Sequence, residues 1–156
     1  MVRISRRIVT GALAAMIAGA VAASEDIADQ YPQSELYAKP VEFIPHVFTA
    51  IGATAPPTYE NSGHNNNLSF VVTPNGVVVI NSGASFRLAK AIHHEIKQVT
   101  DQPVKLVINE NGLGHAMLGN SYWSRIDVDI IAHEDAILEV KENAYQILEH
   151  MKRYNK

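Results

Sequence analysis

The residues of this sequence best suited to chemistry lie in one short loop, residues 109–116, which is punctuated by two glycines. His115 is the only imidazole in that loop, and Glu110 is its only carboxylate. Because imidazole titrates near neutral pH, a histidine working with a carboxylate can transfer protons as a general acid and base. We therefore predict His115 and Glu110 as catalytic residues. The structural alternative for His115 is a histidine at a helix start whose ring bonds the backbone.

The elements around this loop can be read from the hydrophobic pattern. The apolar run Leu106 to Ile108 predicts a buried strand that delivers the loop, and Gly119-Asn120 follows a short helical turn. Gly112 and Gly114 are expected to permit unusual backbone angles, because they lack the spacing of a phosphate-binding loop.

The rest of the chain predicts a strand-rich first half followed by alternating helices and strands. Asn75-Gly76 favours a tight turn between two apolar runs. The expected strands are 41–51 (interrupted near Pro45), 68–73, 77–80, 104–108 and 128–132, and the expected helices are 84–99, one within 115–124, and 136–151. This order predicts an α/β (α+β) domain with a mixed sheet covered by helices on one face.

A loop dense in Pro, Asn, Gly and Ser, residues 52–67, supplies further polar candidates. We predict that His64 and Asn65 bind substrate; the alternative is an Asn-rich turn that satisfies its own hydrogen bonds. His133 precedes two acidic residues at a strand-to-helix junction, where capping is the simpler interpretation. The adjacent His93 and His94 face different directions on a helix, and we expect both to be exposed to solvent.

Several landmarks occur in an order that resembles the metallo-β-lactamase superfamily. They are Gly63-His-Asn-Asn-Asn67, Gly76 to Gly83, Lys105 to Asn109, Gly119-Asn120 and Ile131-Ala-His-Glu-Asp135. The chain is most similar to the exported branch related to the quinoprotein-relay zinc hydrolases. The resemblance runs from Val41 to Lys156 and implies the N-terminal half of that superfamily's αββα sandwich. On this basis we expect the domain to be truncated, with a possible partner covering the missing half.

The resemblance implies metal-assisted hydrolysis of an ester- or amide-type small molecule, with zinc as a possible cofactor. Aligned on Gly119-Asn120, its four ligand positions fall on Asn111, Leu113, His115 and Ala116. Of these, Asn111 and His115 remain as candidate metal ligands. Asn81 stands where the resemblance implies an aspartate that supports the site.

Three interpretations of function follow. The chain is a hydrolase-like protein with an altered or lost zinc site, a non-catalytic exported protein that binds a ligand or partner, or a truncated inactive fragment. A small-molecule substrate or ligand fits the first two. Residues 1–22 have the basic start, apolar middle and small-residue end of a signal peptide, and Arg6-Arg7 also fits a twin-arginine signal. Residues 23–40 form a polar leader, and 41–156 form the domain.

Composition narrows the setting in which the protein works. The net charge is −3, and no basic run follows the predicted signal, so we expect no nucleic-acid partner. The apolar run of the signal is short for a membrane helix, so we expect no stable membrane span after processing. The sequence has no cysteines, which excludes disulfides and thiolate metal ligands. We predict a periplasmic or secreted protein.

Overall fold

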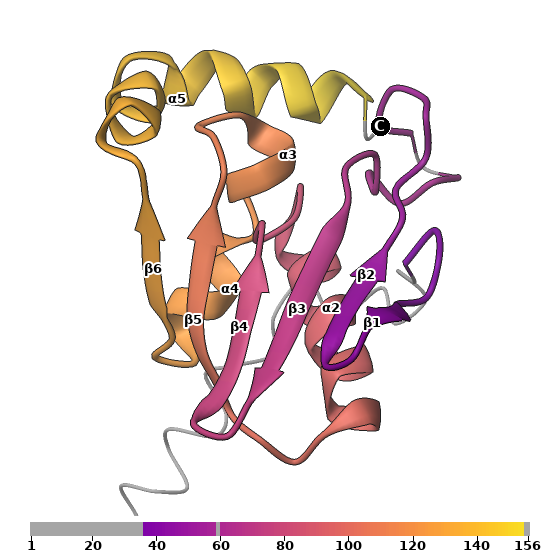
Figure 1. The fold of residues 1–156 in the computed structure, drawn as a ribbon. Helices are drawn as coiled ribbons and strands as arrows, with labels where there is room; N and C mark the ends of the chain where they lie inside the picture. Colours follow the sequence, from indigo (N-terminus) through magenta and orange to yellow (C-terminus); the bar gives the residue numbers. More distant parts are fainter. Residues whose placement is uncertain (1–35, 59, 155–156) are drawn as a thin grey trace, which may run out of the picture. The chain divides into compact units, whose positions relative to one another are not determined.

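A computed structural model describes residues 36–58 and 60–154 (Figure 1). The predicted signal peptide and most of the predicted leader lie outside the described residues. The structure contains one mixed sheet in the order β1-β2-β3-β4-β5-β6. Its strands are β1 (Val41–Ile44), β2 (Val47–Ala50), β3 (Leu68–Thr73), β4 (Gly76–Ile80), β5 (Val104–Asn109) and β6 (Asp129–Ala132). The pairs from β1 to β4 are antiparallel, and β4, β5 and β6 are parallel.

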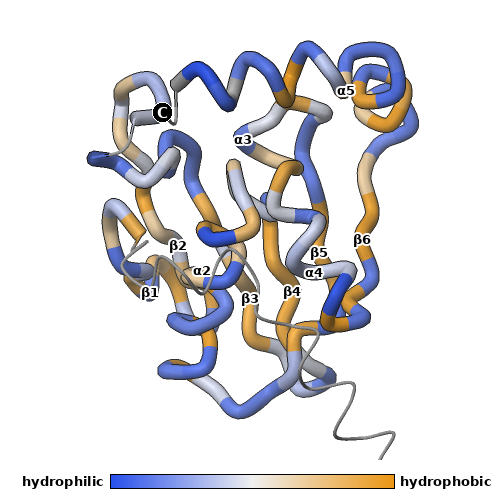
Figure 2. The backbone as a smooth tube through the Cα atoms, turned by 180° about the vertical axis from the view of Figure 1, so that it is seen from behind, coloured by the Kyte–Doolittle hydropathy of each residue, from blue (hydrophilic) through white to orange (hydrophobic). Residues whose placement is uncertain are grey.

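The helices are α2 (Phe86–Val99), α3 (Gly114–Met117), α4 (Asn120–Arg125) and α5 (Glu134–Tyr154). Helix α2 begins where the Ser85 hydroxyl accepts a hydrogen bond from the Leu88 amide, an N-cap that satisfies a free donor. Helices α2 and α4 lie on one face of the sheet, whereas α5 crosses the edge formed by the carboxyl ends of the parallel strands (Figures 1 and 2). The predicted helical cover on one face is therefore correct for α2 and α4, but not for α5.

The hydrophobic core fills the space between the sheet and helices α2 and α4. Phe70, Val79 and Val107 project from the sheet into it and are fully buried. Leu88 and Ile92 meet them from α2. Figure 2, which views the molecule from behind, shows these helices in front of an apolar sheet. The alternation of buried and less buried residues along β3 and β4 is the period of two that a sheet covered on one face requires.

Two elements differ from the sequence prediction. The stretch 41–51 is not one interrupted strand but a hairpin, β1–β2, in which His46 adopts a positive φ of 68°. The Glu42 carboxylate accepts a hydrogen bond from the His46 amide at 2.9 Å and stabilises that turn. The helix predicted within 115–124 is divided into α3 and α4 around Gly119. A Cβ there would lie 2.1 Å from the Ser82 carbonyl oxygen, so only glycine allows this approach.

In the part of the chain that the structure describes, no helix has the length and apolarity needed to cross a membrane.

Candidate functional site

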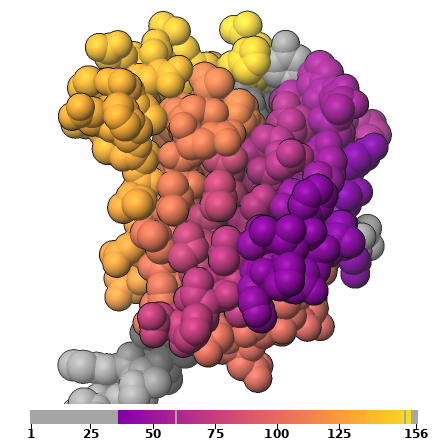
Figure 3. Space-filling view, viewed as in Figure 1, coloured from indigo at the N-terminus to yellow at the C-terminus, as the bar shows by residue number. Residues whose placement is uncertain are grey.

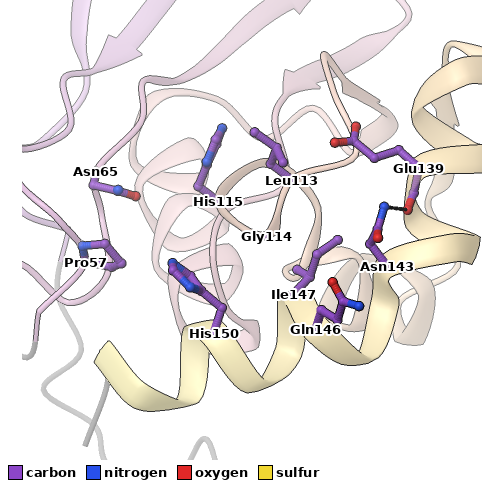
Figure 4. A pocket seen from close by; sticks show the side chains of 10 residues that line it. All are labelled: Pro57, Asn65, Leu113, Gly114, His115, Glu139, Asn143, Gln146, Ile147 and His150. Atoms are coloured by element: carbon purple, nitrogen blue, oxygen red, sulfur yellow. Dashed lines mark hydrogen bonds between the residues drawn. The ribbon is translucent and has the colours of Figure 1, made fainter.

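A cavity of about 380 Å³ opens beside the carboxyl ends of the parallel strands (Figure 4). Its walls come from the loop before β3, from the start of α3 and from one side of α5. The lining residues are Pro57, Asn65, Leu113, Gly114, His115, Glu139, Asn143, Gln146, Ile147 and His150. Ligands of open sheets with parallel strands commonly bind at this end of the strands. The cavity is therefore the candidate site.

Helix α5 is held against the 109–116 loop by a close backbone approach at Gly112. A Cβ on Gly112 would lie 2.6 Å from the carbonyl oxygen of Ala136 and 2.9 Å from a carboxylate oxygen of Glu139. Ala136 is buried by this contact. The glycine thus allows α5 to lie close enough to form the second wall of the cavity.

The predicted catalytic pair is divided by the structure. His115 lines the cavity at the start of α3, and its Nε2 lies 3.5 Å from Nδ2 of Asn111. Glu110 is exposed and is not among the residues that line the cavity. Its backbone amide donates a hydrogen bond to Oδ1 of Asn81 at 3.1 Å, which fixes the end of β5. The carboxylate that shares the cavity with His115 is Glu139 (Figure 4).

The α5 contributions were not predicted from the sequence. Glu139, Asn143, Gln146 and His150 recur at intervals of three or four residues, which is the spacing of one helix face. This spacing of polar residues can be read from the sequence and could have indicated a polar face of α5. It looks the same as a solvated helix face, and only the packing of α5 across the sheet edge makes it a cavity wall.

The donor set around the loop does not fit zinc. The Oδ1 atom of Asn111 already accepts a hydrogen bond from the Leu113 amide at 2.9 Å. Leu113 and Ala116 carry no ligand atom in their side chains. Within residues 36–58 and 60–154, no three His, Asp or Glu side chains are grouped closely enough to hold a metal ion. Protein zinc sites use at least three such ligands, and the described residues place no such set around His115 and Asn111.

The two predicted substrate-binding residues take different positions. Asn65 lines the cavity. His64 is fully buried and does not line the cavity, and its Nδ1 accepts a hydrogen bond from the Tyr37 amide at 3.2 Å. Burial lowers the pKa of His64, which favours the neutral ring. The structure therefore brings Asn65 and His115 to one cavity and leaves His64 buried outside its lining.

Asparagine side chains organise the loops at this end of the sheet. Asn109 is buried, and its amide accepts from the Ser82 backbone at 3.2 Å and donates to Asn120 at 2.9 Å. Asn61 accepts from the amides of Thr58 and Gly63 at 2.8 Å and 3.0 Å. The bonds of Asn109 and the bond from Glu110 to Asn81 join the ends of β4 and β5 to neighbouring segments, whereas the bonds of Asn61 lie within the 52–67 loop and fix its turn.

Two histidine predictions outside the cavity can also be tested. His133 is exposed, and its Nδ1 accepts a hydrogen bond from the Asp135 amide at 3.3 Å, which confirms the capping interpretation. The prediction of exposure is correct for His94 but wrong for His93. The ring of His93 packs beside Trp123, with its Nδ1 2.7 Å from the Tyr122 hydroxyl. Burial, with a smaller contribution from the Lys97 charge, lowers the pKa of His93 to about 4.

Solved structures with a similar fold identify this architecture. A metallo-β-lactamase from Pontibacter korlensis matches with a TM-score of 0.56 and 19% identity, over 68% of this chain and 48% of that one. The chain has part of the metallo-β-lactamase fold. The metallo-β-lactamase FIM-1 from Pseudomonas aeruginosa, in a mono-zinc form, matches with a TM-score of 0.57 and 14% identity, over 71% and 48% of the two chains. A metallo-β-lactamase from Hirschia baltica matches with a TM-score of 0.56 and 14% identity, over 68% and 48%.

The chain thus spans about half the length of the solved structures that it matches. At these identities the likeness shows the fold. No protein-family model matches the sequence, and no curated protein matches it significantly.

Proposed function

We propose that this chain is an exported member of the metallo-β-lactamase superfamily whose cavity binds a small polar organic molecule, of the ester or amide type, without zinc. The observation that carries the proposal is the chemistry of the site. A cavity at the strand ends retains hydrogen-bonding side chains, while the loop beside it has no set of metal ligands.

The lining suits a neutral ligand that has both polar and apolar parts. Asn65, Asn143 and Gln146 offer amide donors and acceptors, and His115 offers an imidazole. Pro57 and Ile147 add apolar surface. Small-molecule sites commonly combine apolar walls with a few placed polar groups in this way.

A second candidate function is hydrolysis by these side chains alone. It is favoured by the presence of His115 and Glu139 in one cavity. In that reaction the His115 imidazole would take a proton from a water molecule as it attacks the carbonyl carbon of an ester. The same proton would then pass to the leaving alkoxide, so the ring ends neutral, as it began.

The test combines a metal titration with a ligand screen on the purified protein. We expect isothermal titration with Zn²⁺ to show no one-to-one binding at micromolar concentration. A library of small esters and amides is expected to contain compounds that raise the melting temperature, and His115→Ala and Asn65→Ala should reduce that rise. His94→Ala is the matched control, because His94 is exposed on α2 and does not line the cavity.

Two results would contradict the binding proposal. One is tight one-to-one zinc binding together with zinc-dependent turnover. The other is a library in which every thermal shift is unchanged by His115→Ala and Asn65→Ala. Metal-free hydrolysis of p-nitrophenyl acetate that falls at least tenfold in His115→Ala would support the second candidate instead, and an unchanged rate would exclude it.

A further inference from the structure

The sequence contains two asparagines that are followed by glycine, Asn75-Gly76 and Asn111-Gly112. The side-chain carbon of an asparagine can be attacked by the backbone nitrogen of the next residue. Glycine permits this attack most readily, because it has no Cβ and its backbone is least restricted. The attack closes a succinimide ring and releases ammonia, and water then opens the ring to a carboxylate. Both pairs are chemically able to lose their amide in this way, but the structure gives them different surroundings.

A turn holds the side-chain amide of Asn111 beside the peptide group that follows it. The Oδ1 atom of Asn111 accepts a hydrogen bond from the Leu113 amide at 2.9 Å. Such an Asx turn closes a ring that contains both Cγ of the asparagine and the nitrogen of the next residue, here Gly112. None of the backbone hydrogen bonds of the described loops uses the Gly112 N–H. The turn therefore brings the carbon that is attacked and the nitrogen that attacks into one small ring.

Two groups beside the Asn111 amide suit the two difficult steps of this reaction. The Leu113 N–H donates to the oxygen on which negative charge develops when Cγ becomes tetrahedral, and a donor placed there stabilises that charge. On the other side of the amide, Nε2 of His115 lies 3.5 Å from Nδ2, the nitrogen that must leave. An imidazole at this position can carry a proton to the leaving group.

We propose that Asn111 is a self-deamidation site, assisted by His115, at which the asparagine becomes an aspartate. The Gly112 nitrogen gives up its proton and forms a bond to Cγ of Asn111. The bond from Cγ to Nδ2 breaks, and Nδ2 receives that proton by way of His115 and leaves as ammonia. A water molecule then adds its hydroxyl group to Cγ and its remaining hydrogen to the Gly112 nitrogen. This step restores the peptide bond and leaves a carboxylic acid, which ionises at neutral pH.

The position of the loop allows water to reach the site and favours aspartate as the product. In the space-filling view, the end of β5 and the start of α3 reach the surface beside α5 (Figure 3), and Leu113 is 43% exposed. Opening of the ring at its other carbonyl gives isoaspartate, which lengthens the backbone by one carbon. Gly112 packs closely against the Ala136 carbonyl, so the lengthened backbone fits this loop less well.

The modification changes the charge of the cavity that His115 lines. The new carboxylate lies beside the imidazole, whereas the carboxylate of Glu110 is outside the cavity. A carboxylate next to an imidazole can hold the ring in one tautomer and one orientation. The modification depends on the geometry of the 109–116 loop alone, so it does not rest on which molecule the cavity binds.

The test follows both Asn-Gly pairs while the full chain is incubated at neutral pH and physiological temperature in water labelled with heavy oxygen. Peptide mass spectrometry measures the labelled carboxylate formed at each position. We expect conversion of Asn111, and we expect His115→Ala to slow it at least tenfold. The conversion of Asn75, in the exposed turn between β3 and β4, should be the same in both proteins. His94→Ala, on the exposed side of α2, is the matched control and should not change the rate at Asn111.

Two further measurements keep the proposal open to refutation if His115→Ala disturbs the loop. Leu113→Pro removes the amide donor at a φ of −82°, which proline tolerates, and should also slow conversion of Asn111. In guanidinium chloride the wild-type and His115→Ala chains should convert Asn111 at the same rate, because the assistance requires the fold. An Asn111 amide that persists while Asn75 is converted would overturn the proposal. Equal rates at Asn111 in the folded wild-type and His115→Ala proteins would also overturn it.

Discussion

The core beneath α2 and the loops at the carboxyl ends of the strands are stabilised by different interactions. In the core, Phe70, Val79 and Trp123 are fully buried and pack against aliphatic side chains of α2. Outside the core, Asn109 at the end of β5 and Asn61 within the 52–67 loop hold the backbone through individual hydrogen bonds. Packing depends on volume and tolerates similar side chains, whereas a buried amide depends on particular partners. The fold is therefore determined mainly by the core, and the shape of the cavity by the loops.

The largest expected effect comes from emptying the core. Trp123→Ala should lower the free energy of unfolding by about 3–5 kcal/mol, because it removes a large buried side chain and leaves a cavity. Urea denaturation followed by circular dichroism measures this loss. The indole Nε1 finds no hydrogen-bond partner within the described residues. Trp123→Phe should therefore cost clearly less than the alanine variant. Equal losses in the two variants would show that volume does not govern this region.

A smaller loss is expected at the strand ends. Asn109→Ala leaves the side-chain oxygen of Asn120 without its donor and leaves the Ser82 amide with only its bond to the Ala116 carbonyl. It should cost about 1–3 kcal/mol in the same assay. Asn143→Ala is the control, because the Asn143 amide donates only to the Glu139 carbonyl within α5. It should change stability by less than about 0.5 kcal/mol. If both variants behave alike, the Asn109 contacts do not stabilise the loops.

The contact between the 109–116 loop and helix α5 can be disrupted by a single substitution. Gly112→Ala places a methyl group against the Ala136 carbonyl and should loosen α5 while leaving the core in place. Hydrogen exchange is expected to increase at least tenfold in α5 and to stay unchanged in β3 and β4. Adding Glu139→Ala should not restore protection, because the backbone carbonyl of Ala136 remains. Unchanged exchange in α5 would contradict the anchoring role of Gly112.

The smallest expected effect is a pH dependence within the core. The folded-state pKa of His93 is lowered to about 4, below its ordinary value of 6.5. The stability linked to its neutral ring is thus present above about pH 6.5 and is lost as the pH falls towards 4. His93→Gln should reduce the difference between urea midpoints at pH 7 and pH 4.5. His94→Gln, on the exposed side of α2, should not, and equal effects would refute the assignment.

The fold was largely predictable because it depends on patterns of hydrophobic residues. The turn at Asn75-Gly76 and the apolar runs of β3, β4 and β5 indicate their elements directly. In the structure these strands begin and end within a few residues of the predicted bounds. The hairpin β1–β2 was missed because it turns at His46, a residue type with only a weak preference for positive φ. The break between α3 and α4 depends on the approach of Gly119 to Ser82, a contact between distant segments.

The site was predictable only in part. His115 and Asn65 do line one cavity, as expected for two loops at one end of a sheet. The exposure of Glu110, the burial of His64 and the partial burial of His93 depend on where each loop and helix packs. The position of α5 decides which polar residues face the cavity. The sequence of α5 shows that it forms a helix but does not show which segment of the chain that helix packs against.

The mixed direction of the sheet bears on how the chain reaches its native state. Strands β3 and β4 pair through a turn of two residues, so this hairpin can form on the microsecond timescale before anything else is in place. Strands β5 and β6 join in parallel, and each must wait for an intervening helical crossover to close. Such distant pairings slow folding, so the kinetics should show an early hairpin and a late step at β6. While that step is pending, the open edge of β5 is the part of the nascent sheet most prone to aggregation.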